Sequence, residues 1–89
     1  MPKKTVVGEY QGHKITVENT WFGGAKLFHN NDLVATNNDF FAVKKSVPLM
    51  SGKITINGVE HLIQVFGYAL ITVKLQIKIN GKYLAGDRF

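Results

Sequence analysis

Three histidines are the first residues of this chain that could do chemistry, because imidazole binds metals and transfers protons near neutral pH. They are His13, His29 and His61. No two of them have the spacing of a ligand pair on one strand, and none stands in an H-E-x-x-H arrangement. We therefore predict no metal site and no cofactor, with the histidines serving as packing or surface residues.

The sequence offers few candidate residues for nucleophilic catalysis. The serines are Ser46 and Ser51, and the G-x-S-x-G pattern of a nucleophile elbow is absent. The glycine pair at 23–24 lies in neither of the glycine-rich phosphate-binding patterns. The expectation is a protein that is not an enzyme and has no catalytic residues.

An aromatic pair, Trp21 and Phe22, stands next to two glycines and includes the one tryptophan of the chain. Exposed on a loop, such a pair would anchor a protein partner, because aromatic side chains dominate interface energetics. Folded back, Trp21 would instead close the open end of a small β domain. The sequence leaves both alternatives open, and Trp21 and Phe22 are the candidate protein-contact residues.

Net charge is +5, from eleven Lys and Arg against six Asp and Glu, which permits attraction to nucleic acid. Lys74 and Lys78 share the polar face of one predicted strand, and Lys26 on a neighbouring strand would extend this basic patch. Base stacking requires aromatic side chains between such lysines, and none stands there. A solvated lysine face is the favoured interpretation, with nucleic-acid binding as the alternative.

The elements that position these residues are strands. Apolar and polar residues alternate through 71–79, and Asn80-Gly81 follows, which is the strongest short signal for a hairpin. Similar patterns predict eight strands at residues 13–18, 25–29, 32–36, 40–45, 53–56, 59–66, 70–79 and 82–85. Within 39–47, a short helix ending before Pro48 is the alternative to the strand over Phe40–Lys45.

Eight short strands in 89 residues predict an all-β fold, an antiparallel β-sandwich with short hairpins, as one domain over residues 1–89. Cysteine is absent, so no disulfide supplements the small core. No segment has the roughly 18 apolar residues of a membrane span, and no signal peptide is recognisable. These features favour a cytoplasmic protein without membrane contact, as a monomer or weak dimer.

A shift of fifty residues aligns the two halves of the chain in part. Asn30 then matches Asn80 and Ala35 matches Ala85, while Gly8 matches Gly58. Hairpin patterns shared by all β proteins explain much of this likeness, so an internal duplication is the lesser alternative.

A family resemblance covers residues 12–85. The order and spacing of GHKITVE at 12–18, GAKL at 24–27, NND at 30–32, GKITI at 52–56, FGYAL at 66–70 and LQIKINGK at 75–82 resemble one β domain of the Fas apoptotic inhibitory molecule family. The resemblance implies an antiparallel β-sandwich and a non-enzymatic role through protein contacts; members of that family oppose cell death in animals and are linked to protection against aggregation. Those members continue into a second domain, and Asn31 stands where the family pattern favours Gly. The fold carries over, the apoptotic role does not, and no site residues come with it.

Taken together, these features predict a small non-enzymatic β-sandwich module that binds an unidentified protein partner.

Overall fold

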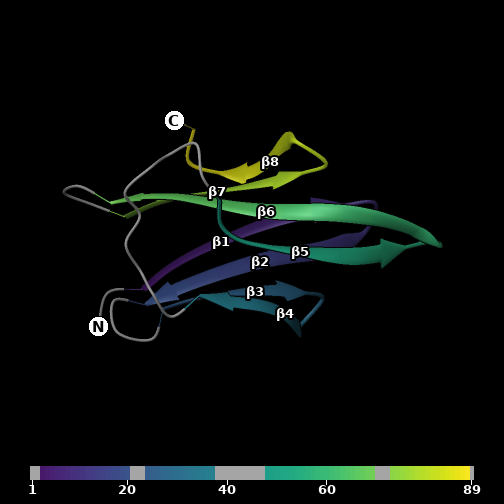
Figure 1. Ribbon diagram of the computed structural model, residues 1–89, viewed down its shortest axis with the longest axis horizontal. Coiled ribbons are helices and arrows are strands. Elements are labelled where there is room, and N and C mark those ends of the chain that lie inside the picture. Colours follow the sequence, from purple (N-terminus) through teal and green to yellow (C-terminus); the bar gives the residue numbers. More distant parts are fainter. Residues whose placement is uncertain (1–2, 21–23, 38–47, 70–72, 89) are drawn as a thin grey trace.

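The computed structural model describes residues 3–20, 24–37, 48–69 and 73–88. All of its regular structure is β (Figure 1). The eight strands are β1 (Lys3–Tyr10), β2 (His13–Thr20), β3 (Gly24–His29), β4 (Asp32–Asn37), β5 (Pro48–Ile56), β6 (Val59–Ala69), β7 (Val73–Ile79) and β8 (Lys82–Gly86).

The strands form two antiparallel sheets of four, each with its strands in chain order. Sheet A is β1-β2-β3-β4 and sheet B is β5-β6-β7-β8. Two-residue turns close four hairpins, and both residues of each turn have positive φ, as in type I′ turns that suit the twist of the strands. All four turns lie at the right-hand end of Figure 1. The predicted all-β sandwich of eight strands is confirmed.

The core lies between the sheets and is almost entirely aliphatic. Alternate residues point inward, as the dyad period of a strand requires. Ile15, Ile63, Leu75 and Ile77 are fully buried, with Val17, Ala25, Leu27, Ile54, Ile56 and Val65 beside them.

Two glycines let the edge strands of opposite sheets approach each other. A Cβ atom on Gly8 of β1 would lie 2.9 Å from side-chain atoms of Leu84 and Ala85 on β8. One on Gly52 of β5 would lie 2.5 Å from Cγ1 of Val34 on β4. Since β1 contacts β8 and β4 contacts β5, both edges of the sandwich are closed in the same way.

The pairing pattern of sheet A is repeated in sheet B. Ile15 of β2 lies opposite His29 of β3, and Ile63 of β6 lies opposite Ile79 of β7. Because β1 contacts β8 and β4 contacts β5, an approximate two-fold axis parallel to the strands relates sheet A to sheet B.

The bulges repeat as well. The register between β3 and β4 shifts after Leu27, and that between β7 and β8 shifts after Ile77, fifty residues later. In both sheets the extra residue lies on the edge strand, at Val34 on β4 and Leu84 on β8. Bulges of this kind discourage an edge strand from pairing with another chain.

The shift of fifty residues therefore holds for β3–β4 against β7–β8 and fails elsewhere. The registers match Ile15 with Ile63, 48 residues apart, and Gly8 with Gly52 rather than Gly58, 44 residues apart. The physical reason is a longer hairpin in sheet B, where β5 and β6 extend two residues further before their turn.

Two differences from the predicted strands concern β1 and β5. The sequence interpretation contained no strand before His13, whereas β1 begins at Lys3, and β5 begins at Pro48 rather than Lys53. The predicted strand over Phe40–Lys45 lies outside the described residues. Among the residues described, none belongs to a helix with the length and apolar character that crossing a membrane requires.

Candidate functional site: the outer face of sheet A

Three apolar side chains and one threonine form a row across the four strands of sheet A, on the face turned away from the core. In register, Val7 of β1 lies opposite Thr16 of β2, Thr16 opposite Phe28 of β3, and Phe28 opposite Leu33 of β4. We call these four residues the outer row. Each is next in sequence to an inward-facing core position, so the alternation of the strands places the outer row on the opposite face.

The outer row leaves two apolar side chains exposed to solvent. Val7 keeps 53% of its surface accessible and Leu33 keeps 56%, while Phe28 and Thr16 are half-buried. Because neighbouring strands lie about 4.8 Å apart, Val7 and Leu33 are separated by about 14 Å across the sheet. Scattered exposed apolar residues are ordinary on protein surfaces, but an aligned set marks a candidate contact surface.

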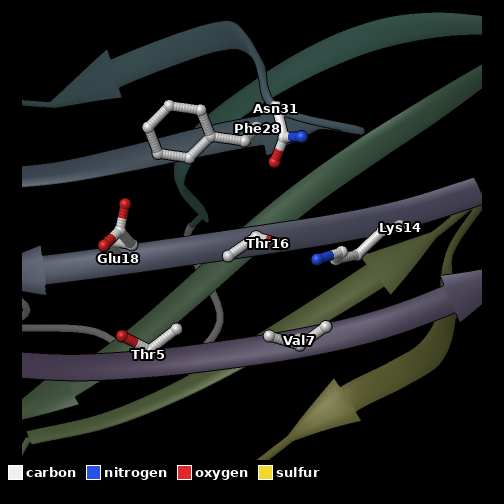
Figure 2. A pocket seen from close by; sticks show the side chains of 7 residues that line it. All are labelled: Thr5, Val7, Lys14, Thr16, Glu18, Phe28 and Asn31. Carbon is white, nitrogen blue, oxygen red and sulfur yellow. The ribbon is translucent and has the colours of Figure 1, made fainter.

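An open hollow of about 360 Å³ runs along β2 on this face. Figure 2 shows Lys14 and Asn31 toward one end, Glu18 at the other, and Thr16 between them. Its lining residues are Thr5, Val7, Lys14, Thr16, Glu18, Phe28 and Asn31.

Sheet B carries a row at the equivalent positions, and this row consists of three polar residues and a tyrosine. Its members are Ser51, Gln64, Lys78 and Tyr83, opposite one another in the same order. These residues stand where Val7, Thr16, Phe28 and Leu33 stand in sheet A. The fold itself therefore does not require apolar side chains at the outer row.

The larger side chains of the row in sheet B are already engaged within the molecule. The Lys78 ammonium lies 4.8 Å from the centre of the Phe66 ring. The Tyr83 hydroxyl donates a hydrogen bond of 2.6 Å to the Gly86 carbonyl, and the Arg88 guanidinium lies 4.1 Å from the Tyr83 ring.

The structure does not bring the three lysines of the predicted basic patch together. Lys74 and Lys78 lie on β7 in sheet B, whose neighbours are β6 and β8. Lys26 lies exposed on β3 in sheet A, so the expectation that it extends their row is wrong. An aromatic residue, Phe66, does lie beside this row, but only 7% of its surface is exposed. It therefore offers no face on which a base could stack.

Two of the histidines meet across β2 and β3. His13 Nδ1 and His29 Nε2 are 2.8 Å apart. Asn30 fixes which atom carries the proton: its Oδ1 accepts the Lys14 N–H at 2.7 Å, which turns its Nδ2 toward His13 Nδ1 at 3.1 Å. His13 Nδ1 must then accept hydrogen bonds, and His29 Nε2 must donate one.

The third histidine has the equivalent place in sheet B. Asn80 Oδ1 accepts the Leu62 N–H at 3.0 Å, and its Nδ2 lies 2.8 Å from Nδ1 of His61. The Tyr10 ring meets His61 edge-on from sheet A. His61 is buried, while His13 is half-buried. All three histidines, which the sequence predicts to be packing or surface residues, contact side chains of other strands.

Chemistry at these histidines is limited by their neighbours. The described residues contain no cluster of three or more His, Asp or Glu side chains that could hold a metal ion. Each Nδ1 that would act as a base is occupied by an asparagine amide.

An ion pair joins the two sheets at the C-terminal end of the described chain. Lys4 Nζ of β1 lies 2.8 Å from Asp87 Oδ2, and the same oxygen accepts the Leu75 N–H at 2.9 Å. The Lys4 hydrogen bond, aided by that of Leu75, holds the pKa of Asp87 below its usual value although partial burial opposes this. The contact is structural, since it links the edge of sheet A to the inner strand of sheet B.

The remaining candidates lie outside the outer row. Trp21 and Phe22, the predicted protein-contact residues, lie outside the described residues, as does Ser46. Ser51 is exposed on β5.

Sequence reasoning missed the outer row, although a signal was present. In Val6-Val7, Leu27-Phe28 and Leu33-Val34, a second apolar residue breaks the alternation next to a core position. Only the register across four strands shows that Val7, Phe28 and Leu33 lie in one line.

Comparison of the chain with protein-family models, with curated proteins and with solved structures found no match.

Proposed function

We propose that this protein is a non-enzymatic protein-binding module and that the outer row of sheet A is its contact surface. The observation that carries the proposal is the contrast between the two halves. At equivalent positions on one backbone pattern, sheet B has Ser51, Gln64 and Lys78 where sheet A has Val7, Thr16 and Phe28.

The energetics agree with a contact surface of modest strength. Fully burying a Val, Leu or Phe side chain is worth about 1.5–3 kcal/mol. Val7 and Leu33 are about half exposed, so covering them together with Phe28 contributes on the order of 2–4 kcal/mol. That range suits a small apolar centre surrounded by polar contacts.

The family resemblance and the predicted contact residues Trp21 and Phe22 belong to the same proposal. The resemblance to the Fas apoptotic inhibitory molecule family implies a role through protein contacts, which agrees with a binding face. The expected cytoplasmic location also stays part of the proposal.

A crosslinking experiment tests the outer row with a matched control. A photo-crosslinking phenylalanine analogue is placed at position 33 in one protein and at position 83, its counterpart in sheet B, in another. Both are irradiated in an extract of the source cells. We expect discrete crosslinked partners from position 33 that are lost when the same chain carries Val7→Ser and Phe28→Lys.

The two substitutions copy the residues of sheet B, so they suit this backbone. We expect the unfolding free energy of Val7→Ser with Phe28→Lys to fall by no more than about 1–2 kcal/mol, because Val7 is exposed and Phe28 is half-buried. Equal crosslinking from positions 33 and 83, or crosslinking that persists in the double variant, contradicts the proposal.

Nucleic-acid binding through the lysine-bearing face of sheet B is the alternative. Lys74 and Lys78 support it, while the separation of Lys26 and the burial of Phe66 count against it. Binding to mixed oligonucleotides that weakens steeply with salt, and that Lys74→Ala with Lys78→Ala removes, would favour this alternative.

A further inference from the structure

We propose that the hollow along β2 binds an extended segment of a protein partner in which an acidic residue stands two positions from an aliphatic or aromatic residue. This inference rests on the proposed function and adds the chemistry of the partner.

The shape of the hollow favours an extended chain. Its walls come from β1 and β3, which lie about 10 Å apart on either side of β2. A helix with its side chains is about 10–12 Å across, as wide as the whole strip between β1 and β3, whereas an extended segment is one strand wide. An extended segment lies along β2 and follows the hollow.

The separation of the side chains that β2 contributes to the hollow matches that of alternate side chains in an extended partner segment. Lys14 and Thr16 are alternate residues of β2, so their side chains stand about 6.7 Å apart on one face. Alternate side chains of an extended partner segment have the same separation. One partner residue therefore reaches Lys14 while the residue two positions along reaches the outer row between Val7 and Phe28.

The charge at the turn end selects an acid. Figure 2 shows the Lys14 side chain directed along the hollow toward Thr16, with the amide of Asn31 near the same end. Ammonium, amide and hydroxyl groups there can all donate to a carboxylate. Glu9 lies opposite Lys14 in register, but it does not line the hollow and no ion pair joins the two among the described residues, so Lys14 is the charge that the hollow presents at this end.

The other end of the hollow does not select a charge. Glu18 lines this end, but it already interacts within the molecule, and Lys26 lies opposite it in register outside the lining residues. The motif is accordingly limited to two positions, the acid over Lys14 and the apolar residue over the outer row.

A second copy of this chain fits the hollow less well. Two concave faces placed together leave a gap, and each copy has a net charge of +5, which opposes association. Edge-to-edge pairing is discouraged at β4 and β8 by their bulges.

The test is an NMR titration of the ¹⁵N-labelled protein with three synthetic peptides in Gly-Ser flanks. One carries Glu-Ser-Leu, one Lys-Ser-Leu, and one Glu-Leu with no residue between. We expect saturable shifts at the amides of Val7, Lys14 and Thr16 with the first peptide. The dissociation constants of the other two should be at least five-fold higher.

Charge reversal provides the decisive comparison. Lys14→Glu should invert the preference so that the Lys-Ser-Leu peptide binds more tightly, whereas Lys82→Glu, an exposed lysine in the β7–β8 hairpin, should leave the preference unchanged. Equal binding of the Glu and Lys peptides, shifts located elsewhere, no binding at all, or an unchanged preference in Lys14→Glu overturns the inference. Crosslinking from position 33 can still succeed in those cases, so failure of this motif and failure of the proposed function are distinguishable.

Discussion

Asn30 and Asn80 occupy the same place in the two halves of the fold, fifty residues apart. Each is the first residue of a type I′ turn, and each side-chain amide joins that turn to a backbone N–H and a histidine Nδ1 on the neighbouring strand. Each backbone N–H also bonds across to the carbonyl of the same neighbour, Lys14 or Leu62. The asparagine therefore acts as a clasp between consecutive hairpins.

Loss of the clasp at Asn80, which contacts the buried His61, should destabilise the protein. Asn80→Ala removes the side-chain partner of the exposed Leu62 N–H and of buried His61, and leaving a buried group such as His61 Nδ1 unsatisfied costs about 1–3 kcal/mol. Asn57→Ala is the control, because Asn57 also begins a type I′ turn with a φ of 52° but makes no such contact among the described residues. We expect urea unfolding to show a loss for Asn80→Ala that exceeds the loss for Asn57→Ala by that amount. Equal losses would show that only the turn conformation matters.

Asn31 is a position where substitution should stabilise the fold. Its φ is 100°, outside the region that asparagine tolerates well, and its counterpart in sheet B is Gly81. Asn31→Gly relieves strain of order 1–3 kcal/mol, while the added chain flexibility costs about 0.4–1 kcal/mol. We expect a net gain of about 1 kcal/mol, seen as a higher melting temperature. Asn30→Gly should lower it, because that change removes the clasp.

These turns show which parts of the fold the sequence predicts. Asn80-Gly81 and Asn57-Gly58 predict their hairpins, and the alternation through 71–79 predicts the inner strand β7 of sheet B. Gln11-Gly12 has the same turn conformation without the asparagine, which is why β1 was not predicted. The candidate site depends on register across four strands, and no local pattern contains that information.

The offset of the repeat shows the same limit. A shift of fifty residues found Asn30 and Asn80 because no residue is inserted between β3 and β4 relative to β7 and β8. The same shift matched Gly8 with the turn residue Gly58. The β5–β6 hairpin has two extra residues on each strand, and only the strand registers show them.

The ion pair between Lys4 and Asp87 should make stability depend on pH in the acid range. Because the pKa of Asp87 is lowered from 3.8 in the folded state, its stabilising effect is complete above the unfolded pKa. It is lost as pH falls below 3.8 and through the lowered folded pKa. We expect the unfolding free energy of Asp87→Asn to fall less than that of the unmodified protein between pH 6 and pH 3. Lys4→Met should behave alike, and an identical fall in all three would remove Asp87 as a cause.

The approach of the edge strands at Gly52 gives the sharpest test of the sandwich itself. Gly52→Ala places a methyl group 2.5 Å from Cγ1 of Val34 in the facing sheet, and overpacking of this kind costs about 1–3 kcal/mol. Val34→Ala alone removes half-buried methyl groups and should also destabilise. In the double variant the smaller residue on β4 makes room for the new methyl group on β5, so the two losses should be less than additive, with a coupling above about 0.5 kcal/mol in a double-mutant cycle. The pair Val7→Ser with Gly52→Ala is the control, because Val7 faces away from the core and its effect should simply add. Strict additivity for Gly52 and Val34 would mean that β4 and β5 do not close that edge of the sandwich.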